Sequence, residues 1–181
     1  MTTNPWLVSI TSLRRAPGSR RAERRTGPVG RLSVAGSVVD EADEVSADAV
    51  LDSVDGGIEV SADVSAPWSG ECRRCLKPVR GRLQVHVREL YREHRHPSDK
   101  DDEETYPLRG EMLNLKPLVS DAILLDLPLA PLCSESCKGL CATCGADLND
   151  GPCACDPAPT DPRWAALDSL QPGGVERSAG A

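Results

Sequence analysis

Hydrophobic and polar residues alternate along two neighbouring segments near the middle of the chain. Residues 56–68 and 79–91 place apolar side chains at every second position, which is the period of a strand with one buried face. The apolar positions are Ile58, Val60, Ala62 and Val64 in the first segment and Leu83, Val85 and Val87 in the second. Only "ECRRCLKP" separates the two segments, so we expect a hairpin with a cysteine turn at its tip.

Shorter alternating segments precede this hairpin. Residues 6–13 and 30–39 predict short strands. Residues 14–28, between them, are rich in arginine and contain a Pro-Gly and a Gly-Pro pair, so we expect an extended or disordered loop there. The acidic runs within residues 40–55 and 94–105 lack the spacing of a calcium loop, and we interpret them as solvated surface.

Two helices are predicted in the second half of the chain. Residues 115–128 are apolar over much of a helix circumference, Pro117 suits the first turn, and Pro128 ends the segment. Residues 161–170 begin with a capping Asp and a Pro and continue with Trp and Leu on one face, which predicts a short terminal helix.

Composition narrows the class of protein. Aromatic residues make up 3% of the chain, so its core must be built from Val, Leu, Ile and Ala. The net charge is -7, yet residues 14–25 hold six Arg and one Glu, an asymmetry typical of an interaction segment. Neither an export signal nor a membrane span is visible, so we expect a cytoplasmic protein whose thiols are kept reduced.

Eight cysteines in such a chain favour metal binding over disulfides. Structural zinc needs four ligands at tetrahedral corners, and a Cys-x2-Cys turn supplies two of them. The C-terminal cysteines follow the spacing Cys-x2-Cys-x8-Cys-x-Cys, with a glycine that closes the turn and an Asn-Asp-Gly reversal. We expect one zinc ion to be held by Cys141, Cys144, Cys153 and Cys155.

The other four cysteines leave alternatives open. The simplest partition gives a second zinc site made of Cys72, Cys75, Cys133 and Cys137. A competing partition groups Cys133 and Cys137 with Cys141 and Cys144. The basic residues around the hairpin turn fit the charge of a four-thiolate zinc site, but they also lower thiol pKa values, so a reactive dithiol is the rival interpretation. These residues are Arg73, Arg74, Lys77, Arg80 and Arg82.

These observations define the expected organisation. We predict an α+β fold: an antiparallel β-sheet with a cysteine-tipped hairpin, one buried helix, and a C-terminal zinc knuckle with a short terminal helix. Residues 1–132 would form the core domain, residues 133–172 a cysteine-rich zinc-binding tail with the terminal helix, and residues 173–181 a disordered tail.

No catalytic motif emerges. The sequence contains no phosphate-binding glycine loop, no Gly-x-Ser-x-Gly and no His-Glu-x-x-His. His86, His94 and His96 are expected on the surface rather than in a metal or catalytic site. We therefore expect no enzymatic activity and no small-molecule substrate.

Four stretches occur in one order that resembles the YceD family of bacterial proteins: "ECRRCLKPV", "VSDAILLDLPLAPLC", "CKGLCATCGADLNDGPCAC" and "DPRWAALDSL". The resemblance runs from about residue 30 to 170. It implies a role in large ribosomal subunit biogenesis and accumulation of its RNA, with Cys72 and Cys75 as the family's signature pair and the later cysteines as an additional cluster. Val79, where the family often has an aromatic residue, and the long arginine-rich segment depart from the pattern.

The expected function is a non-enzymatic factor that binds ribosomal RNA or a large-subunit ribosomal protein and no membrane. Arg73, Arg74, Lys77, Arg80 and Arg82 would contact RNA phosphates. The alternative is that these residues only balance the acidic chain and its thiolates, since no aromatic stacking platform accompanies them. Two other functions stay open: a thiol oxidoreductase using Cys72 and Cys75, and a zinc-ribbon module of another machine such as transcription.

Overall fold

The computed structural model describes residues 4–93, 105–155 and 163 and divides into two compact units. The first unit spans Met1–Cys137 and the second Lys138–Ala181. From the sequence we placed this boundary before Cys133; the structure instead includes Cys133 and Cys137 in the first unit. The predicted acidic loop, except for Thr105, and the predicted terminal helix and C-terminal tail lie outside the described residues, apart from the single residue Arg163.

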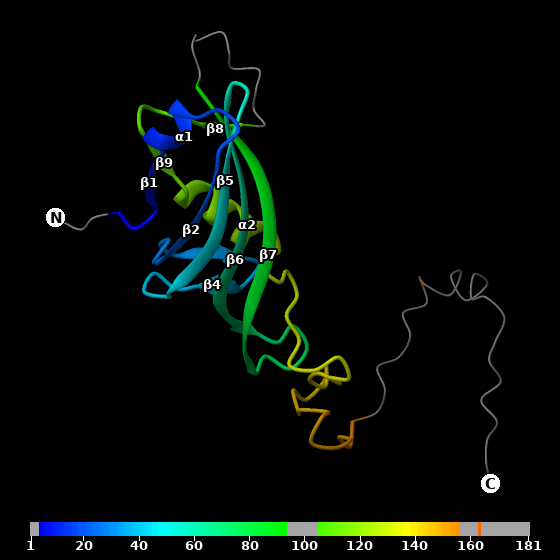
Figure 1. Cartoon of the computed structure of the whole chain (residues 1–181). Helices are drawn as coiled ribbons and strands as arrows, with labels where there is room; N and C mark the ends of the chain where they lie inside the picture. Colours follow the sequence, from blue (N-terminus) through cyan, green and yellow to red (C-terminus); the bar gives the residue numbers. More distant parts are fainter. Residues whose placement is uncertain (1–3, 94–104, 156–162, 164–181) are drawn as a thin grey trace. The chain divides into compact units, whose positions relative to one another are not determined.

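The main element of the first unit is a mostly antiparallel sheet of seven strands (Figure 1). Its order is β2-β5-β6-β4-β3, with β7 on the other side of β6 and β8 beyond β7. A separate two-stranded ribbon pairs β1 with β9. The strands are β1 Leu7–Ser9, β2 Arg20–Gly27, β3 Leu32–Val34, β4 Ser37–Val39, β5 Val45–Val54, β6 Gly57–Glu71, β7 Pro78–Arg92, β8 Tyr106–Pro107 and β9 Met112–Asn114.

The predicted hairpin is confirmed. β6 and β7 pair along their whole length, from Gly57 opposite Arg92 to Glu71 opposite Pro78. Gly81 allows the ring of Trp68 to lie flat against the neighbouring strand, because a Cβ atom at this position would come within 2.8 Å of that ring. The cysteine turn therefore sits at the end of a long, regular two-stranded element.

The acidic residues of 40–55 face solvent as predicted, but the strand β5 within that range was not predicted. β5 lies inside the sheet, where Val45, Ala47, Ala49 and Leu51 are buried. The acidic residues occupy the alternate positions and face solvent. The acidic residues in and around this segment had concealed a strand whose other face is apolar.

The prediction of a loop for residues 14–28 is wrong. Residues 11–15 form α1, Thr11–Arg15, and residues 20–27 form β2, which pairs with β5. Arg20 and Arg24 stand opposite Asp52 and Asp48 of β5 and form ion pairs with them. Cross-strand charge pairs of this kind stabilise a strand that carries little apolar surface.

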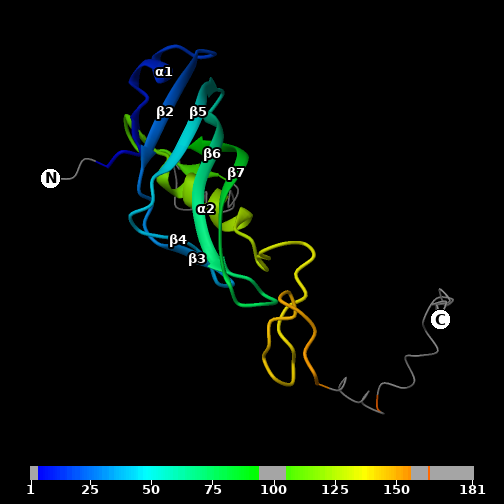
Figure 2. The same ribbon diagram turned by 90° about the horizontal axis from the view of Figure 1, so that it is seen from below.

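One helix covers the inner face of the sheet (Figures 1 and 2). The prediction for residues 115–128 is confirmed as α2, Lys116–Asp126, with a proline in its first turn. Leu118, Val119, Ala122 and Ile123 are buried, whereas Leu125, predicted to be on the apolar surface of the helix, is 88% exposed. α2 packs on β7, β6 and β3.

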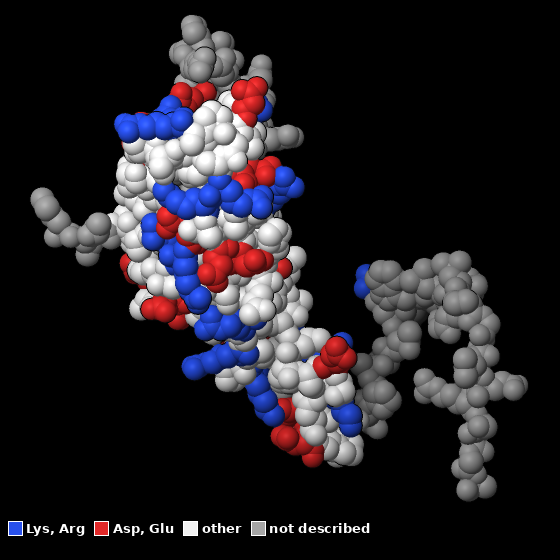
Figure 3. Space-filling view, in the orientation of Figure 1, with Lys and Arg blue, Asp and Glu red and all other residues white. Residues whose placement is uncertain are grey.

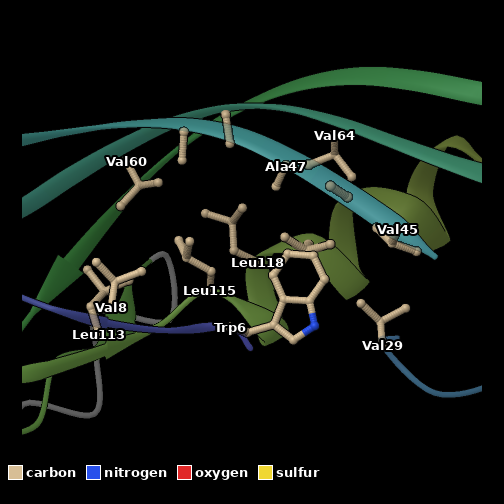
Figure 4. Close-up of a cluster of buried hydrophobic side chains, with 14 of the residues drawn as sticks. Trp6, Val8, Val29, Val45, Ala47, Val60, Val64, Leu113, Leu115 and Leu118 are labelled. Atoms are coloured by element: carbon tan, nitrogen blue, oxygen red, sulfur yellow. The ribbon is translucent and has the colours of Figure 1, made fainter. Parts of the chain in front are cut away.

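The core lies between the sheet and the layer formed by α2 and the β1–β9 ribbon. Figure 4 shows Trp6, Val8, Leu113, Leu115 and Leu118 opposite the side chains of β5 and β6. The indole N–H of Trp6 donates to the carbonyl of Pro28 at 2.9 Å. Among the described residues the core is aliphatic apart from Trp6 and Tyr91, as the scarcity of aromatic residues indicates. No helix in the described part of the chain is long and apolar enough to cross a membrane.

Candidate metal centres

The first candidate centre begins at the tip of the β6–β7 hairpin. The N–H of Leu76 donates to the carbonyl of Cys72 at 2.9 Å, and the N–H of Cys72 donates to the carbonyl of Lys77 at 2.8 Å. The turn closes because Leu76 adopts a φ of 60°, a left-handed conformation that is uncommon for a side chain of this size. These two bonds direct both cysteine side chains of the turn to one point.

The segment after α2 brings two further cysteines to the same point. The hydroxyl of Ser37 donates to the carbonyl of Pro128 at 2.5 Å, and the N–H of Arg73 donates to the carbonyl of Pro131 at 2.9 Å. The guanidinium of Arg74 donates to the carbonyl of Cys137 at 2.7 Å and to that of Glu135 at 3.2 Å. Consecutive arginines of the hairpin turn thus hold the Cys133–Cys137 loop in place.

The four sulfurs of this first centre fit a tetrahedral metal. Cys72, Cys75, Cys133 and Cys137 have Sγ atoms that all lie within 4.8 Å of one another. The Cys72–Cys137 and Cys75–Cys133 separations are 3.8 and 3.6 Å. Four sulfurs at about 2.3 Å from a tetrahedral zinc ion are roughly 3.8 Å apart, whereas a disulfide would bring two of them to about 2.05 Å.

The second candidate centre lies in the second unit and repeats the same turn. The N–H of Gly145 donates to the carbonyl of Cys141 at 2.9 Å, and the N–H of Cys141 donates to that of Ala146 at 2.8 Å. The chain reverses around Asn149, whose side-chain oxygen accepts the N–H of Lys138 at 2.8 Å.

The reversal returns the last two cysteines to the turn. The Sγ atoms of Cys141, Cys144, Cys153 and Cys155 also lie within 4.8 Å of one another. The structure thus gathers the eight cysteines into two groups of four, either of which can hold a metal ion. The grouping matches the simplest partition expected from spacing and not the competing one.

Backbone N–H groups point at the first sulfur of each turn. The N–H of Cys75 is the main cause that lowers the pKa of the Cys72 thiol to about 6. The N–H groups of Cys144 and Thr143 lower the pKa of Cys141 to about 6 in the same way. Such donors favour the thiolate, which is the form that binds metal. Each turn therefore presents one thiolate near neutral pH.

Other thiols in the two groups hold their protons more tightly. The thiol of Cys144, followed by burial, raises the pKa of Cys155 to about 12. At Cys75 the N–H of Lys77 favours the thiolate, but burial and the neighbouring thiols outweigh it and raise the pKa to about 12. Since like charges at these distances repel, a divalent cation is the natural means of ionising all four thiols together.

Burial argues against a catalytic dithiol in the first centre. A thiol oxidoreductase needs a thiolate that an incoming disulfide can reach. Cys72 is 0% exposed and Cys75 is 5% exposed, and both face two further sulfurs of the same group. This arrangement favours a structural metal centre over redox catalysis.

The five basic residues that we expect to contact RNA have different surroundings. The guanidinium of Arg74 donates to two carbonyls of the Cys133–Cys137 loop. Arg82 donates to the hydroxyl of Ser65 at 3.2 Å, whereas Arg73 and Arg80 have no ion-pair partner among the described residues. Arg80 and Arg82 lie on the outer face of β7. On the face of the molecule seen in Figure 3, basic and acidic side chains interleave. Lys77 lies beside the turn and has polar contacts of its own.

Two features of the site were missed from the sequence. The side chain of Arg74 holds the Cys133–Cys137 loop of the first centre, and nothing in the local sequence distinguishes Arg74 from Arg73. The outer face of β7 carries His86 and Arg88, which pair with Asp63 and Glu59 of β6. The surface position expected for His86 is confirmed, whereas His94 and His96 lie outside the described residues.

Fold and cysteine groups together define a mostly antiparallel β-sheet protein with two candidate four-cysteine metal centres. The chain belongs to the YceD family: the family model described as "Large ribosomal RNA subunit accumulation protein YceD" matches residues 60–171. That match covers the hairpin from Val60 onward, α2 and all eight cysteines. The resemblance noted from the four sequence stretches is thereby confirmed.

Proteins with similar sequences occur in bacteria and in plants. An uncharacterized protein of Mycobacterium tuberculosis is 36% identical over 167 residues, which cover 91% of this chain and 80% of that protein. A maize protein is 38% identical over 60 residues, covering 33% of this chain and 20% of that protein. It is named "Large ribosomal RNA subunit accumulation protein YCED homolog 1, chloroplastic". No solved structure matches this chain.

Proposed function

We propose that this protein is a non-enzymatic factor of large ribosomal subunit biogenesis that supports accumulation of the large-subunit ribosomal RNA. The observation that carries the proposal is the family match, which spans the hairpin tip, α2 and both cysteine groups. The names of the family model and of the maize relative describe the same role. The absence of a catalytic motif supports a binding function. Its expected place of action is the cytoplasm.

Each cysteine group would hold one zinc ion in this proposal. Four thiols at mutual distances suited to a tetrahedral ion, with no carboxylate among them, favour zinc over magnesium or calcium. A zinc site closed by four protein ligands has no open position for substrate or water, so its contribution is to structure.

The RNA contact would lie at the hairpin tip and along the adjacent end of β7. Arg73, Arg80 and Arg82, supported by Lys77, present positive charge beside a turn fixed by the metal centre. Phosphate contacts of this kind supply affinity without reading the base sequence. Arg74 would position the turn rather than touch RNA, because its guanidinium already serves two carbonyls of the Cys133–Cys137 loop.

The experiment is depletion of the protein in its own host, followed by complementation. We expect depletion to lower the ratio of large to small subunits and the level of mature large-subunit ribosomal RNA, and the unaltered chain to restore both. The double variant Arg80→Glu/Arg82→Glu should restore them poorly. The control Arg15→Glu/Arg109→Glu makes the same change in net charge at two exposed arginines away from the hairpin tip and should complement fully.

Two results would contradict the proposal. An unchanged subunit ratio after depletion would remove the ribosomal role. Copurification with RNA polymerase, and not with pre-ribosomal particles, would instead favour a zinc-ribbon module of transcription. Full complementation by Arg80→Glu/Arg82→Glu would leave the role in place and refute the RNA contact.

A further inference from the structure

The main sheet has two long edge strands, β2 and β7. Within the described residues β2 pairs only with β5, and β7 pairs with β6 and, at Tyr91 and Arg92 alone, with β8. The edge of β7 is therefore open from Pro78 to Leu90 over the described part of the chain. An open edge is a template for pairing with another chain, and proteins that avoid such pairing protect it.

β2 is protected by inward charges. Its inner row consists of Arg21, Glu23 and Arg25, in which Glu23 forms ion pairs with both arginines at 2.9 Å. A strand added beside β2 would have to cover these charges, which is a known device against edge-to-edge association. β2 is thus unsuited to accept a further strand.

β7 lacks this protection from Val79 to Val87. Its inner row there is Val79, Gly81, Leu83, Val85 and Val87, followed by Glu89, and Val85 and Val87 are only partly buried against the core. A strand added beside these five residues would cover apolar surface on one face. The two edges therefore differ over this range, because charged side chains line the inner face of β2 and apolar ones line that of β7.

The hydrogen bonds at the C-terminal end of β7 show which of its N–H and C=O groups face the open edge. The carbonyl of Arg92 accepts the N–H of Leu108 on the β8 side, whereas the carbonyl of Tyr91 faces Gly57 on the β6 side. Successive residues of a strand point their N–H and C=O groups to opposite sides. The groups that face the open edge therefore belong to the alternate residues Arg80, Arg82, Gln84, His86, Arg88 and Leu90.

Charge decides which strand can pair there. A second copy joined edge to edge about a twofold axis at Gln84 would place Arg80 opposite Arg88 and Arg82 opposite His86, and like charges directly opposite destabilise a sheet. An acidic strand avoids this repulsion and matches Arg80 and Arg82, which face Ser69 and Pro67 of β6 rather than acids. The sheet already contains a strand of this kind: β5 carries Asp48 and Asp52 on its outer face and apolar residues on its inner face, and the two acids pair with Arg24 and Arg20 of β2.

We propose that the edge of β7 between Pro78 and Leu90 is the docking site for an extended segment of a partner protein in which acidic and apolar residues alternate. Backbone hydrogen bonds to the open edge would supply affinity, and the acidic side chains would lie over the arginine row while the apolar ones cover Val85 and Val87. This partner and RNA would use the same Arg80 and Arg82 and would therefore bind in turn, and the proposal does not depend on the ribosomal role.

The probe is a synthetic peptide with the sequence of residues 44–55, EVSADAVLDSVD, titrated into the full-length chain prepared with zinc. We expect the backbone amides of Arg82, Gln84, His86 and Arg88 to exchange with solvent roughly tenfold more slowly when the peptide is bound. A control peptide with lysine in place of its four acidic residues should not protect them. This readout uses the unaltered protein and no RNA.

A matched pair of variants tests the backbone contact. Gln84→Pro removes an N–H that faces the open edge and leaves the pairing with β6 intact, so it should weaken peptide binding about tenfold or more. Gln84→Ala keeps the N–H and should bind within about twofold of the unaltered chain. Zinc content and thermal unfolding establish that both variants are folded.

Three outcomes would overturn the proposal. These are the absence of peptide-induced protection along β7, equal binding of the acidic and lysine peptides, and unchanged binding to a folded Gln84→Pro variant. The first two are measured on the unaltered chain, so a variant that fails to fold does not remove the test. If the depletion experiment refuted the ribosomal role, these peptide-binding results would still stand.

Discussion

The two cysteine centres each contain a turn of the same type, but the protein around the two turns differs. In both turns the N–H of the residue after the second cysteine donates to the carbonyl of the first cysteine at 2.9 Å. The N–H of the first cysteine donates at 2.8 Å to the carbonyl of the residue two positions after the second cysteine. In the first centre Cys72, Cys75 and Cys137 are buried against a sheet with its own core. In the second centre no residue of the described range 138–155 belongs to the hydrophobic core.

This difference changes what a bound metal would do. At the hairpin it would fasten a loop to a sheet that apolar burial already stabilises. In the second unit it would take the place of a core, as in small domains that fold only when metal binds. The same local chemistry would therefore serve two roles, and metal removal should separate them most clearly.

Metal removal should affect the two units unequally. We expect a zinc chelator to abolish the structure of residues 138–155, because the metal supplies on the order of 10 kcal/mol of the folding free energy of such a unit. The sheet should persist with a lower unfolding temperature. Amide hydrogen exchange across the chain measures both effects at once. Loss of protection in β5 and β6 on chelation would show that the first centre is as essential to its unit as the second.

Arg74→Ala should loosen the first centre alone. It removes hydrogen bonds from a charged group to two carbonyls of the Cys133–Cys137 loop, for which we expect a loss of about 2 kcal/mol in the free energy of unfolding of the first unit. Arg73→Ala is the control, because the contact of Arg73 with Pro131 uses the backbone N–H and survives the change. Chemical denaturation followed by sheet circular dichroism measures the two variants. Equal losses would contradict the positioning role of Arg74.

Substitution of the residue that closes each turn should change the free energy of unfolding by a smaller amount, with opposite signs in the two turns. Leu76 has a φ of 60° and Gly145 a φ of 74°, so the same left-handed position is taken by a leucine in one turn and by a glycine in the other. Gly145→Ala should destabilise the second unit by about 1 kcal/mol although open space surrounds the new methyl group. Leu76→Gly should stabilise the first by about 0.5 kcal/mol, since relief of strain exceeds the added freedom of the unfolded chain.

Denaturant midpoints of the zinc-loaded variants test this pair. Leu76 is 60% exposed, so its replacement loses little apolar burial. A destabilised Leu76→Gly variant would indicate that the leucine side chain contributes a packing contact larger than the strain it causes.

Proton release should differ between the two centres. The Cys72 thiol, whose pKa is lowered to about 6, is ionised at pH 7.5 and protonated at pH 5. At the first centre, where the sheet keeps the turn folded without metal, zinc binding should therefore release about one proton fewer at pH 7.5 than at pH 5. At the second centre, whose turn is expected to unfold without metal, the release should be nearly the same at the two pH values. In the metal-free chain, the stability that the lowered pKa of Cys72 contributes is present at high pH and is lost as the pH falls through about 6.

Calorimetric zinc titrations in buffers of different ionisation enthalpy count the protons. A chain with only Cys72, Cys75, Cys133 and Cys137, obtained by Cys→Ser changes at the other four, isolates the first centre. Release that does not vary with pH would mean that the backbone donors do not stabilise a thiolate before metal arrives.

Some parts of this molecule could be predicted from the sequence because their cause is local. The β6–β7 hairpin follows from strict alternation around a short turn, and α2 from a continuous apolar face between prolines. The spacing of Cys141, Cys144, Cys153 and Cys155 is likewise local. The convergence of Cys133 and Cys137 on the hairpin tip rests on contacts between distant segments, so the sequence allowed it without requiring it.

The errors share a physical origin. Neither β2 nor β5 is recognisable as a strand when it is considered alone, since one is dense in arginine and the other contains several acidic residues. Their charges match only in the antiparallel register that sets Arg20 opposite Asp52 and Arg24 opposite Asp48. Pairwise complementarity between strands is invisible to a pattern search within one segment, and the same limit concealed the role of Arg74.

The sulfur atoms of Cys72 and Cys137 meet across 65 positions of sequence. A contact of such separation carries a large loop-closure entropy and is formed late in folding, after the hairpin and α2 have shortened the path between its ends. The ion at the first centre would therefore bind a chain whose topology is already decided. It should slow unfolding more than it speeds folding, so this centre governs how long the folded protein persists rather than how quickly it appears.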